Sequence, residues 1–220
     1  KNLLNHFKTQ SLEGFGCEGM KQATSAAGAM IHYLHETQKS ALEHINSITP
    51  FYIHDYMALD QSTATSLELI QSSEGTRKNS LLSLLDESCT PMGARRIREW
   101  IIKPLIDPEK IKSRLEIVSK FKSFPLDRQE IRNLLEKIFD LERLLGKITL
   151  SVCNARDLVS LKNSIESFPD LYKSLNKFED AQLSGYLKNW DNLEFLHDLI
   201  EKNIVDDPPI SLKEGNLFKP

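Results

Sequence analysis

From residue 80 onward, hydrophobic residues recur at intervals of three and four, which is the spacing of one face of an α-helix. The segment 90–105 shows the pattern most clearly. Thr90 can cap a helix, Pro91 suits the first turn, and Pro104 ends it. The apolar residues on one face are Ala94, Ile97 and Ile101. We therefore expect a short, buried amphipathic helix with a basic outer side and with Trp100, a candidate core ring, near its end.

The same periodicity predicts helices on both sides of this segment. Residues 20–42 are rich in alanine and free of proline, which predicts a helix of about six turns. After Pro125, apolar residues keep the spacing of one helix face as far as Ile148, which predicts one helix. Further helices are expected at 107–121, 154–168, 171–178 and 186–204, with a turn at 179–184.

The stretch from Ile45 to Leu59 differs, because β-branched and aromatic residues gather there around Pro50. This composition predicts one or two short strands, and residues 67–70 could extend a small sheet. Short linkers between helices favour a bundle. We expect a mainly α fold, a multi-helix bundle with long lever-type helices and one small β element near residues 48–70.

Composition narrows the class of protein. The 220 residues are 40% hydrophobic and 27% charged. The 28 Lys and Arg residues are outnumbered by 31 Asp and Glu, which gives a net charge of −3. A free-standing nucleic-acid-binding protein usually has an excess of basic residues, and this chain has none. No apolar run reaches the roughly 18–20 residues of a membrane span. The chain starts at Lys1, and we expect an excised part of a longer protein. Cys17, Cys89 and Cys153 form no CxxC pair, which favours a reducing compartment.

Residues 14–19 match the G-x-G-x-x-G pattern of dinucleotide-binding loops. That site needs a strand before the loop, and none is predicted here. Met20 stands where a phosphate-binding loop requires lysine. We interpret the segment as a loop that enters the next helix, and expect no ATPase site in these residues.

Other candidate chemistry is weak. His32 and His35 could share a helix face, but Lys39 stands where the zinc-protease pattern needs a second histidine, and no third ligand is near. Asp86, Glu87 and other carboxylates suit caps and surface positions. We expect no catalytic, cofactor-binding or metal-binding residue, and hence no enzyme within this chain.

Basic residues are densest between residues 77 and 103, and they could contact phosphates. The cluster consists of Arg77, Lys78, Arg95, Arg96, Arg98 and Lys103. The favoured alternative is that Arg95 and Arg98 pair with neighbouring acids or a facing element while the others are solvated. Aromatic residues are not interleaved with the cluster, and the overall charge is negative.

The segment 90–105 also carries a resemblance. Its pattern Thr90-x-x-Gly93-x-Arg95-x-Ile97-x-x-Trp100-Ile101-x-x-Pro104-Leu105 is similar to the core region of the MutS family of DNA mismatch-repair proteins. Flanking segments agree in order, namely 11–16, 26–29, 33–34, 37–39, 56–63, 67–69, 80–86, 140–144, 154–158 and 207–209. Thr65-Ser66 departs from the arginine–asparagine pair usual in the family. The match is closer to bacterial than to eukaryotic members.

The resemblance implies a division of the chain and a set of coupling residues. Residues 1–17 would end a connector domain, 18–205 would form a helical core and lever, and 206–220 would lead into a clamp. The structural or coupling candidates are Tyr56, Asp60, Glu68, Thr90, Pro91, Gly93, Arg95, Trp100 and Pro104.

The implied function is mechanical. The chain would be the core and lever part of a DNA mismatch-repair ATPase, transmitting conformational change between the ATPase domain and the mismatched-DNA-binding and clamp domains. The full-length protein would bind ATP with Mg and mismatched double-stranded DNA, form a homodimer and meet a MutL-type factor in the cytoplasm, with no membrane association. Two alternatives remain: a helical module that binds the nucleic-acid backbone directly, and an interaction scaffold of a MutS-like protein outside mismatch repair.

Overall fold

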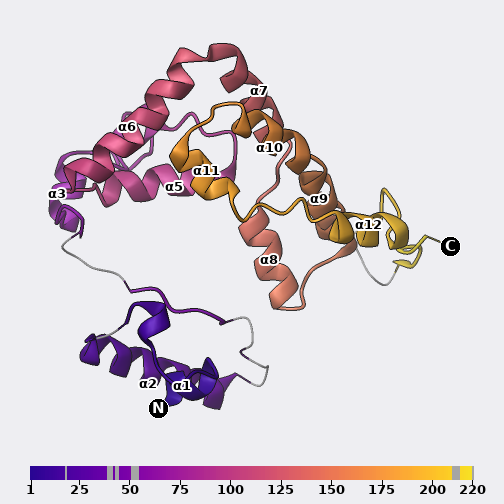
Figure 1. Ribbon diagram of the computed structural model, residues 1–220, viewed down its shortest axis with the longest axis horizontal. Coiled ribbons are helices and arrows are strands. Elements are labelled where there is room, and N and C mark those ends of the chain that lie inside the picture. The colour runs from indigo at the N-terminus through magenta and orange to yellow at the C-terminus, as the bar shows by residue number, and fades with distance from the viewer. Residues whose placement is uncertain (18, 39–41, 43–44, 51–54, 210–213, 220) are drawn as a thin grey trace. The chain divides into compact units, whose positions relative to one another are not determined.

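The structure is a computed structural model that describes residues 1–17, 19–38, 42, 45–50, 55–209 and 214–219. It divides into two compact units, Lys1–Ile53 and His54–Pro220, which we treat separately. Helices account for about half of the first unit and for most of the second (Figure 1). The expectation of a mainly α fold is confirmed.

The first unit contains α1 (Asn2–His6), a 3₁₀ turn η1 (Glu13–Phe15) and α2 (Lys21–Thr37). The two α-helices pack together, and a Cβ on Gly28 of α2 would be in ordinary van der Waals contact with the Leu3 side chain of α1, at 3.8 Å. The buried apolar residues of this unit are Leu3, Cys17, Ile31 and Leu42. Thus α2 packs with residues 1–17. It ends at Thr37, and the predicted residues 39–41 lie outside the described part.

The second unit contains the remaining helices, all of which except α4 are labelled in Figure 1. They are α3 (Gln61–Ser66), α4 (Leu81–Leu85), α5 (Pro91–Ile102), α6 (Pro108–Ser123), α7 (Pro125–Leu135), α8 (Leu141–Thr149), α9 (Ala155–Glu166), α10 (Phe168–Asn176), α11 (Ala181–Leu187) and α12 (Glu194–Asn203). The local sequence determines where several of these helices begin. Asp107 caps α6, and Asn154 forms a capping box with Asp157 at α9.

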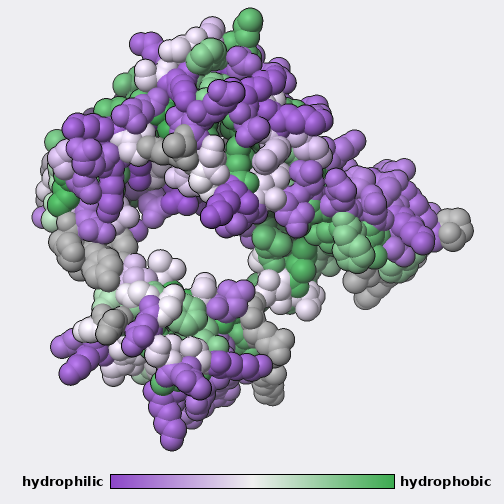
Figure 2. Space-filling view, in the orientation of Figure 1, coloured by the Kyte–Doolittle hydropathy of each residue, from purple (hydrophilic) through white to green (hydrophobic). Residues whose placement is uncertain are grey.

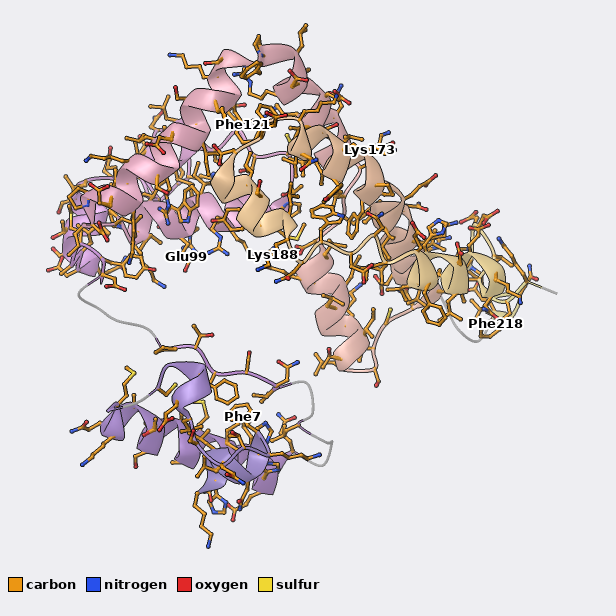
Figure 3. The ribbon with its side chains drawn as sticks, viewed as in Figure 1. Phe7, Glu99, Phe121, Lys173, Lys188 and Phe218 are labelled. Atoms are coloured by element: carbon orange, nitrogen blue, oxygen red, sulfur yellow. The ribbon has the colours of Figure 1, made fainter. Side chains whose placement is uncertain are left out.

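Two hydrophobic clusters hold the second unit together. One lies among α8, α9 and α12 and contains Leu144, Leu161, Ile165 and Ile200. The other lies between α7 and α10 and contains Ile131, Ile138, Leu171 and Phe178. Phe121 of α6 reaches the second cluster, with its ring centroid 4.7 Å from that of Phe178 (Figure 3). Leu141 and Phe168 pack on both clusters.

The predicted β element is wrong for the described residues between 48 and 70. Residues 61–66 form α3, and only an isolated bridge joins Tyr56 to Leu105. Backbone hydrogen bonds at Glu68 and Leu69 go to the first residues of α4 instead of to a strand. Residues 51–54, which also belong to that prediction, lie outside the described range.

The single helix expected from Pro125 to Ile148 is also wrong, because the structure breaks it into α7 and α8 at residues 136–140. The break has no proline or glycine. Asp140 caps α8 from within the break, and the tertiary contacts described below hold it there.

The last part of the chain differs from prediction in two places. The predicted turn at 179–184 begins a helix, since Asp180 Oδ1 accepts from Leu183 N at 3.2 Å before α11 continues to Leu187. The helix predicted from residue 186 to 204 is interrupted before α12. There Leu193 has a left-handed backbone (φ 53°), and Asp191 Oδ1 accepts from its N–H at 2.8 Å.

Within the part of the chain that the structure describes, no helix combines the length and apolar character needed to cross a membrane.

Candidate coupling site

The start of α5 shows why its sequence has threonine, proline and glycine. Thr90 Oγ1 accepts from Gly93 N at 3.0 Å, and Pro91 occupies the first turn, where its missing N–H costs nothing. A Cβ on Gly93 would stand 3.1 Å from Thr90 Oγ1 and 3.3 Å from Ser88 Cβ. A side chain there would therefore require Thr90 or Ser88 to shift by a few tenths of an ångström.

Arg95 joins α5 to the start of α8, a segment 45 residues later in the chain. Its Nη1 and Nη2 atoms donate to the two Asp140 carboxylate oxygens at 2.8 and 2.7 Å. Its Nε atom donates to Glu142 Oε2 at 3.0 Å. A guanidinium that holds two carboxylates in this way fixes orientation as well as distance. We call these three residues the Arg95 fork.

Asp140 has a second task, because it caps α8 by accepting from Arg143 N at 3.2 Å. The hydrogen bonds from Arg95 lower the pKa of Asp140 to about 2. The same contacts raise the pKa of Arg95. The fork thus stays charged at neutral pH and holds the first turn of α8.

A buried serine holds the residue before Asp140. Phe139 N donates to Ser164 Oγ at 3.0 Å, and Ser164 Oγ donates to Ser160 O at 2.8 Å. Ser164 lies on α9 and is 0% exposed. Residues 136–140, which we call the α7–α8 junction, are therefore held from α5 on one side and from α9 on another.

Trp100 is not a core ring. It is 43% exposed, and the Arg114 guanidinium carbon of α6 lies 4.0 Å from its ring centroid. α5 has no buried residue, so the expectation of a buried helix is wrong for this chain. The reason is that α5 meets its neighbours through ion pairs, a cation–π contact and half-buried side chains, so burial is incomplete. Truncation of Trp100 should cost less than the roughly 3–5 kcal/mol of a buried ring.

The end of α5 is joined to an earlier segment. Met57 N donates to Pro104 O at 2.8 Å, beside the bridge between Tyr56 and Leu105. Of the predicted candidates, the structure therefore brings Tyr56 and Pro104 together at one end of α5. Thr90, Pro91 and Gly93 lie at its other end.

Asp60 and Glu68 have local tasks away from the Arg95 fork. Asp60 Oδ1 accepts from Thr63 N at 2.6 Å and caps α3, and this hydrogen bond lowers the pKa of Asp60. Glu68 Oε1 accepts from Ser73 N at 2.6 Å, which closes the loop before α4. No chemistry beyond these hydrogen bonds follows from either contact.

Neighbouring carboxylates neutralise much of the positive charge of the basic cluster. Arg77 pairs with Asp86, while Glu99, which is labelled in Figure 3, accepts from Arg96 at 3.1 Å and from Lys103 at 3.5 Å. Arg95 pairs with Asp140 and Glu142, as described. The other two members, Lys78 and Arg98, are exposed. The cluster is therefore mixed in charge, and contacts to phosphates stay a prediction.

A second charged group holds the segment after α12. Glu201 accepts from Lys162 at 2.5 Å and from Lys219 at 2.9 Å, and Lys219 also lies 3.2 Å from Asp206. The hydrogen bonds from Lys162 and Lys219 lower the pKa of Glu201 to about 2. Val205 N donates to Leu217 O at 3.1 Å, so this terminal segment returns along the end of α12.

Sequence reasoning missed some of these residues as site members. Asp140 had a signal, because an aspartate directly before an apolar helical run is typical of a cap. Glu142 and Glu201 resemble any surface acid. Ser164 has no signal, because a serine inside a helix can equally face solvent.

Candidate metal ligands do not gather among the described residues, where no group of three or more His, Cys, Asp or Glu could hold an ion. His32 lies 3.4 Å from Glu36, and His35 Nε2 lies 3.1 Å from His6 Nδ1. The glycine-rich loop follows α1 and leads into α2, with η1 inside it.

Family models match almost the whole chain. The model described as MutS domain II matches residues 1–46, and the model described as MutS domain III matches residues 62–220. The boundary between the two matches falls in the region where the structure separates its two units.

Curated relatives agree with these matches. The chain is 46% identical over 218 residues to the DNA mismatch repair protein MutS of Halothermothrix orenii, covering 99% of this chain and 24% of the relative. It is 40% identical over 220 residues to the protein of the same name from Symbiobacterium thermophilum, covering 100% and 25%. The chain thus spans about a quarter of the length of these relatives.

Proposed function

The chain belongs to the MutS family of DNA mismatch repair proteins, and we propose that it transmits conformational change between the ATP-binding part and the DNA-gripping parts of the full-length protein. The matched models are those of domains II and III. ATP and Mg binding, and the ATPase active site, would belong to parts of the protein outside these residues. Within the chain, residues 1–17 would end a connector, 18–205 would form the core and lever, and 206–220 would lead into a clamp.

The Arg95 fork is the observation that supports this role most directly. It joins two helices that are far apart in the sequence, through hydrogen bonds of 2.6 to 3.0 Å to two carboxylates. A displacement of α5 would therefore be passed to the first turn of α8. Coupling between distant sites needs a chain of such contacts between stiff elements.

The charged group around Glu201 supports the other end of the same path. It fixes Asp206 and Lys219 to α9 and α12, so that a movement of these helices would move these two residues with them. The full-length protein would act on mismatched double-stranded DNA as a homodimer in the cytoplasm, with a MutL-type factor downstream. These partners are proposals that rest on family membership.

The test is the linkage between ATP and DNA in the full-length protein that contains this chain. The affinity for mismatched DNA is measured with and without ATP, and the ratio of the two gives the coupling. Arg95→Gln should bring this ratio toward one while leaving ATP affinity alone and DNA affinity alone nearly unchanged. Arg96→Gln, on the same helix and in an exposed ion pair, is the matched control. An unchanged ratio in Arg95→Gln would contradict the proposal.

The alternative of direct nucleic-acid binding has its own test. Fluorescence anisotropy of labelled DNA, mismatched or fully paired, is measured with the 220-residue chain at low and moderate salt. Weak binding, equal for both DNAs, would agree with the transmitting role. Tight, salt-dependent binding would mean that these residues hold the phosphate backbone themselves.

A further inference from the structure

The α7–α8 junction is broken without a proline or glycine, and the cap residue Asp140 is its one local signal for a helix start. Its residues are Glu136, Lys137, Ile138, Phe139 and Asp140. None of them is proline or glycine, the residues that most disfavour a helix interior. The apolar phase also continues across the junction, from Ile131 before it to Ile148 after it. By local preference, residues 125–149 would form one amphipathic helix.

We infer that this junction is a joint with two states, the broken one described above and a continuous helix from Pro125 to Thr149, and that Arg95 and Ser164 are the positioning residues that select the broken state. The inference goes beyond the proposed function and does not rest on it, because it concerns the conformation of the 220-residue chain itself.

The two states satisfy the same backbone groups with different partners. In the broken state, Ser164 Oγ accepts from Phe139 N, and the Asp140 carboxylate accepts from Arg143 N. In a continuous helix those two N–H groups would instead donate to the carbonyls four residues earlier. The first turn of α8 therefore gains no hydrogen bond from the break that a continuous helix would not supply. A few tertiary contacts can decide between states that are balanced in this way.

Contacts from α5 and α9 hold the broken state, and besides the Arg95 fork and Ser164 they include the ion pair between Lys147 of α8 and Asp157 of α9 at 2.5 Å. The Arg95 fork reaches Asp140 and Glu142 only if the first turn of α8 lies where it is now. Ser164 is fully buried and keeps its second hydrogen bond, to Ser160 O, in either state. Loss of both contacts would leave the broken state with an unpartnered N–H at Phe139 and no anchor for the α8 cap.

Packing holds each helix through one buried residue, Ile131 of α7 and Leu144 of α8. Leu144 lies in the cluster with Leu161 and Ile165, so a continuous helix would have to draw it out of that cluster. Leu145 and Ile148 of α8 are 55% and 38% exposed and would not oppose the change. Figure 2 shows hydrophobic surface where Figure 1 draws α8.

The test is backbone NMR of the 220-residue chain and of Arg95→Gln, Ser164→Ala and the double variant. The inference predicts that Cα shifts of residues 137–140 move toward helical values, furthest in the double variant, and that amide exchange at Phe139 slows. The matched controls are Arg96→Gln on the same helix and Ser174→Ala. Ser174 is a buried serine that donates to Glu130 at 3.0 Å, away from the junction. Both controls should leave these shifts unchanged.

A glycine supplies a second, independent readout. Lys137→Gly disfavours a continuous helix, so adding it to the double variant should return the shifts of residues 138–140 to those of the unsubstituted chain. A merely structural role for Arg95 and Ser164 predicts no such return. Shifts that stay unchanged in all variants, or an α8 that loses its helical shifts, would overturn the inference. If the double variant does not fold, the single variants decide the question. Failure here leaves the ATP–DNA coupling test unaffected.

Discussion

Two helix junctions of the second unit are in contact, yet they end their helices by different means. Between α9 and α10, Pro169 stands in the first turn of α10, has no N–H to donate, and would clash with a carbonyl four residues earlier. Between α7 and α8, no residue excludes a continuing helix, and the Arg95 fork and Ser164 hold the break. A break enforced by a covalent ring persists in every conformation. A break held by tertiary contacts can be reversed.

The largest loss of stability should come from a substitution in the hydrophobic core that supports both junctions. Ile165 of α9 is 2% exposed and lies in the cluster with Leu144 and Leu161. Ile165→Ala should lower the free energy of unfolding by about 2–5 kcal/mol, because it removes buried methyl groups and leaves a cavity. Urea unfolding followed by circular dichroism measures this.

The control for that variant is Leu145→Ala on α8, which is 55% exposed and should change the free energy of unfolding by about 0.5 kcal/mol or less. A loss below about 1 kcal/mol in Ile165→Ala would mean that this cluster does not support the two junctions.

Substitution of Ser164 should have a smaller effect on stability, and it should act on the α7–α8 junction only. Ser164→Ala removes the acceptor of Phe139 N, and an unpartnered N–H costs about 1–3 kcal/mol. If the joint instead shifts toward a continuous helix, Phe139 N finds a new acceptor and the loss falls below that range. Ser174→Ala is the comparison, since Glu130 keeps its hydrogen bond from Lys177 at 3.0 Å. Equal changes at residues 137–140 in both variants would contradict a special role for Ser164.

Pro169→Ala should affect the α9–α10 junction and leave the α7–α8 junction unchanged. Alanine restores an N–H that can donate to the carbonyl of Ile165, so α9 and α10 should join, with a change in stability of about 1 kcal/mol or less. Cα shifts of residues 166–169 report the joining, and those of residues 137–140 should stay as they are. Persistence of the break would show that tertiary packing holds this junction too.

The effect of acid on the Arg95 fork should be smaller than the pKa shift of Asp140 alone would give, because the Arg95 side chain is 49% exposed and solvent screens the pair. The pKa of Asp140 is about 2 in the folded chain and about 3.9 in an unfolded one. The fork therefore stabilises the folded state fully above about pH 5, and this contribution is lost as the pH falls toward 2. Asp140→Asn should remove this part of the pH dependence.

The control for the acid experiment is Glu201→Gln, because Glu201 also has a pKa of about 2 but lies away from the junction. NMR titration of residues 137–140 distinguishes the two sites. Equal sensitivity of the α9–α10 junction to acid would contradict the comparison, because Pro169 does not titrate.

Much of the helical layout could be predicted, and the cap residues explain why. Thr90, Asp107 and Asn154 bind backbone groups two or three residues away, so their effect is contained in short segments of sequence. The candidate site could be predicted only in part. Arg95 was identified, whereas its partners Asp140 and Glu142 depend on how α5 and α8 meet.

The errors have a common physical origin. Trp100 has the spacing of a core residue, but the ring lies under Arg114 at a half-exposed position. Residues 67–70 have strand-like composition, but the backbone around Glu68 bonds to the start of α4. In both cases local preference was overruled by the neighbours that the fold supplied.

The sequence by itself determined that this chain is helical and where most of its helices begin, because periodicity, caps and prolines act over a few residues. Its ordered segments, such as residues 90–105, also indicated the family. Only the tertiary structure decided that the helix after Pro125 breaks before the cap residue Asp140. That choice depends on a guanidinium 45 residues away in the sequence and on a serine 25 residues away, and their meeting is a property of the packed chain.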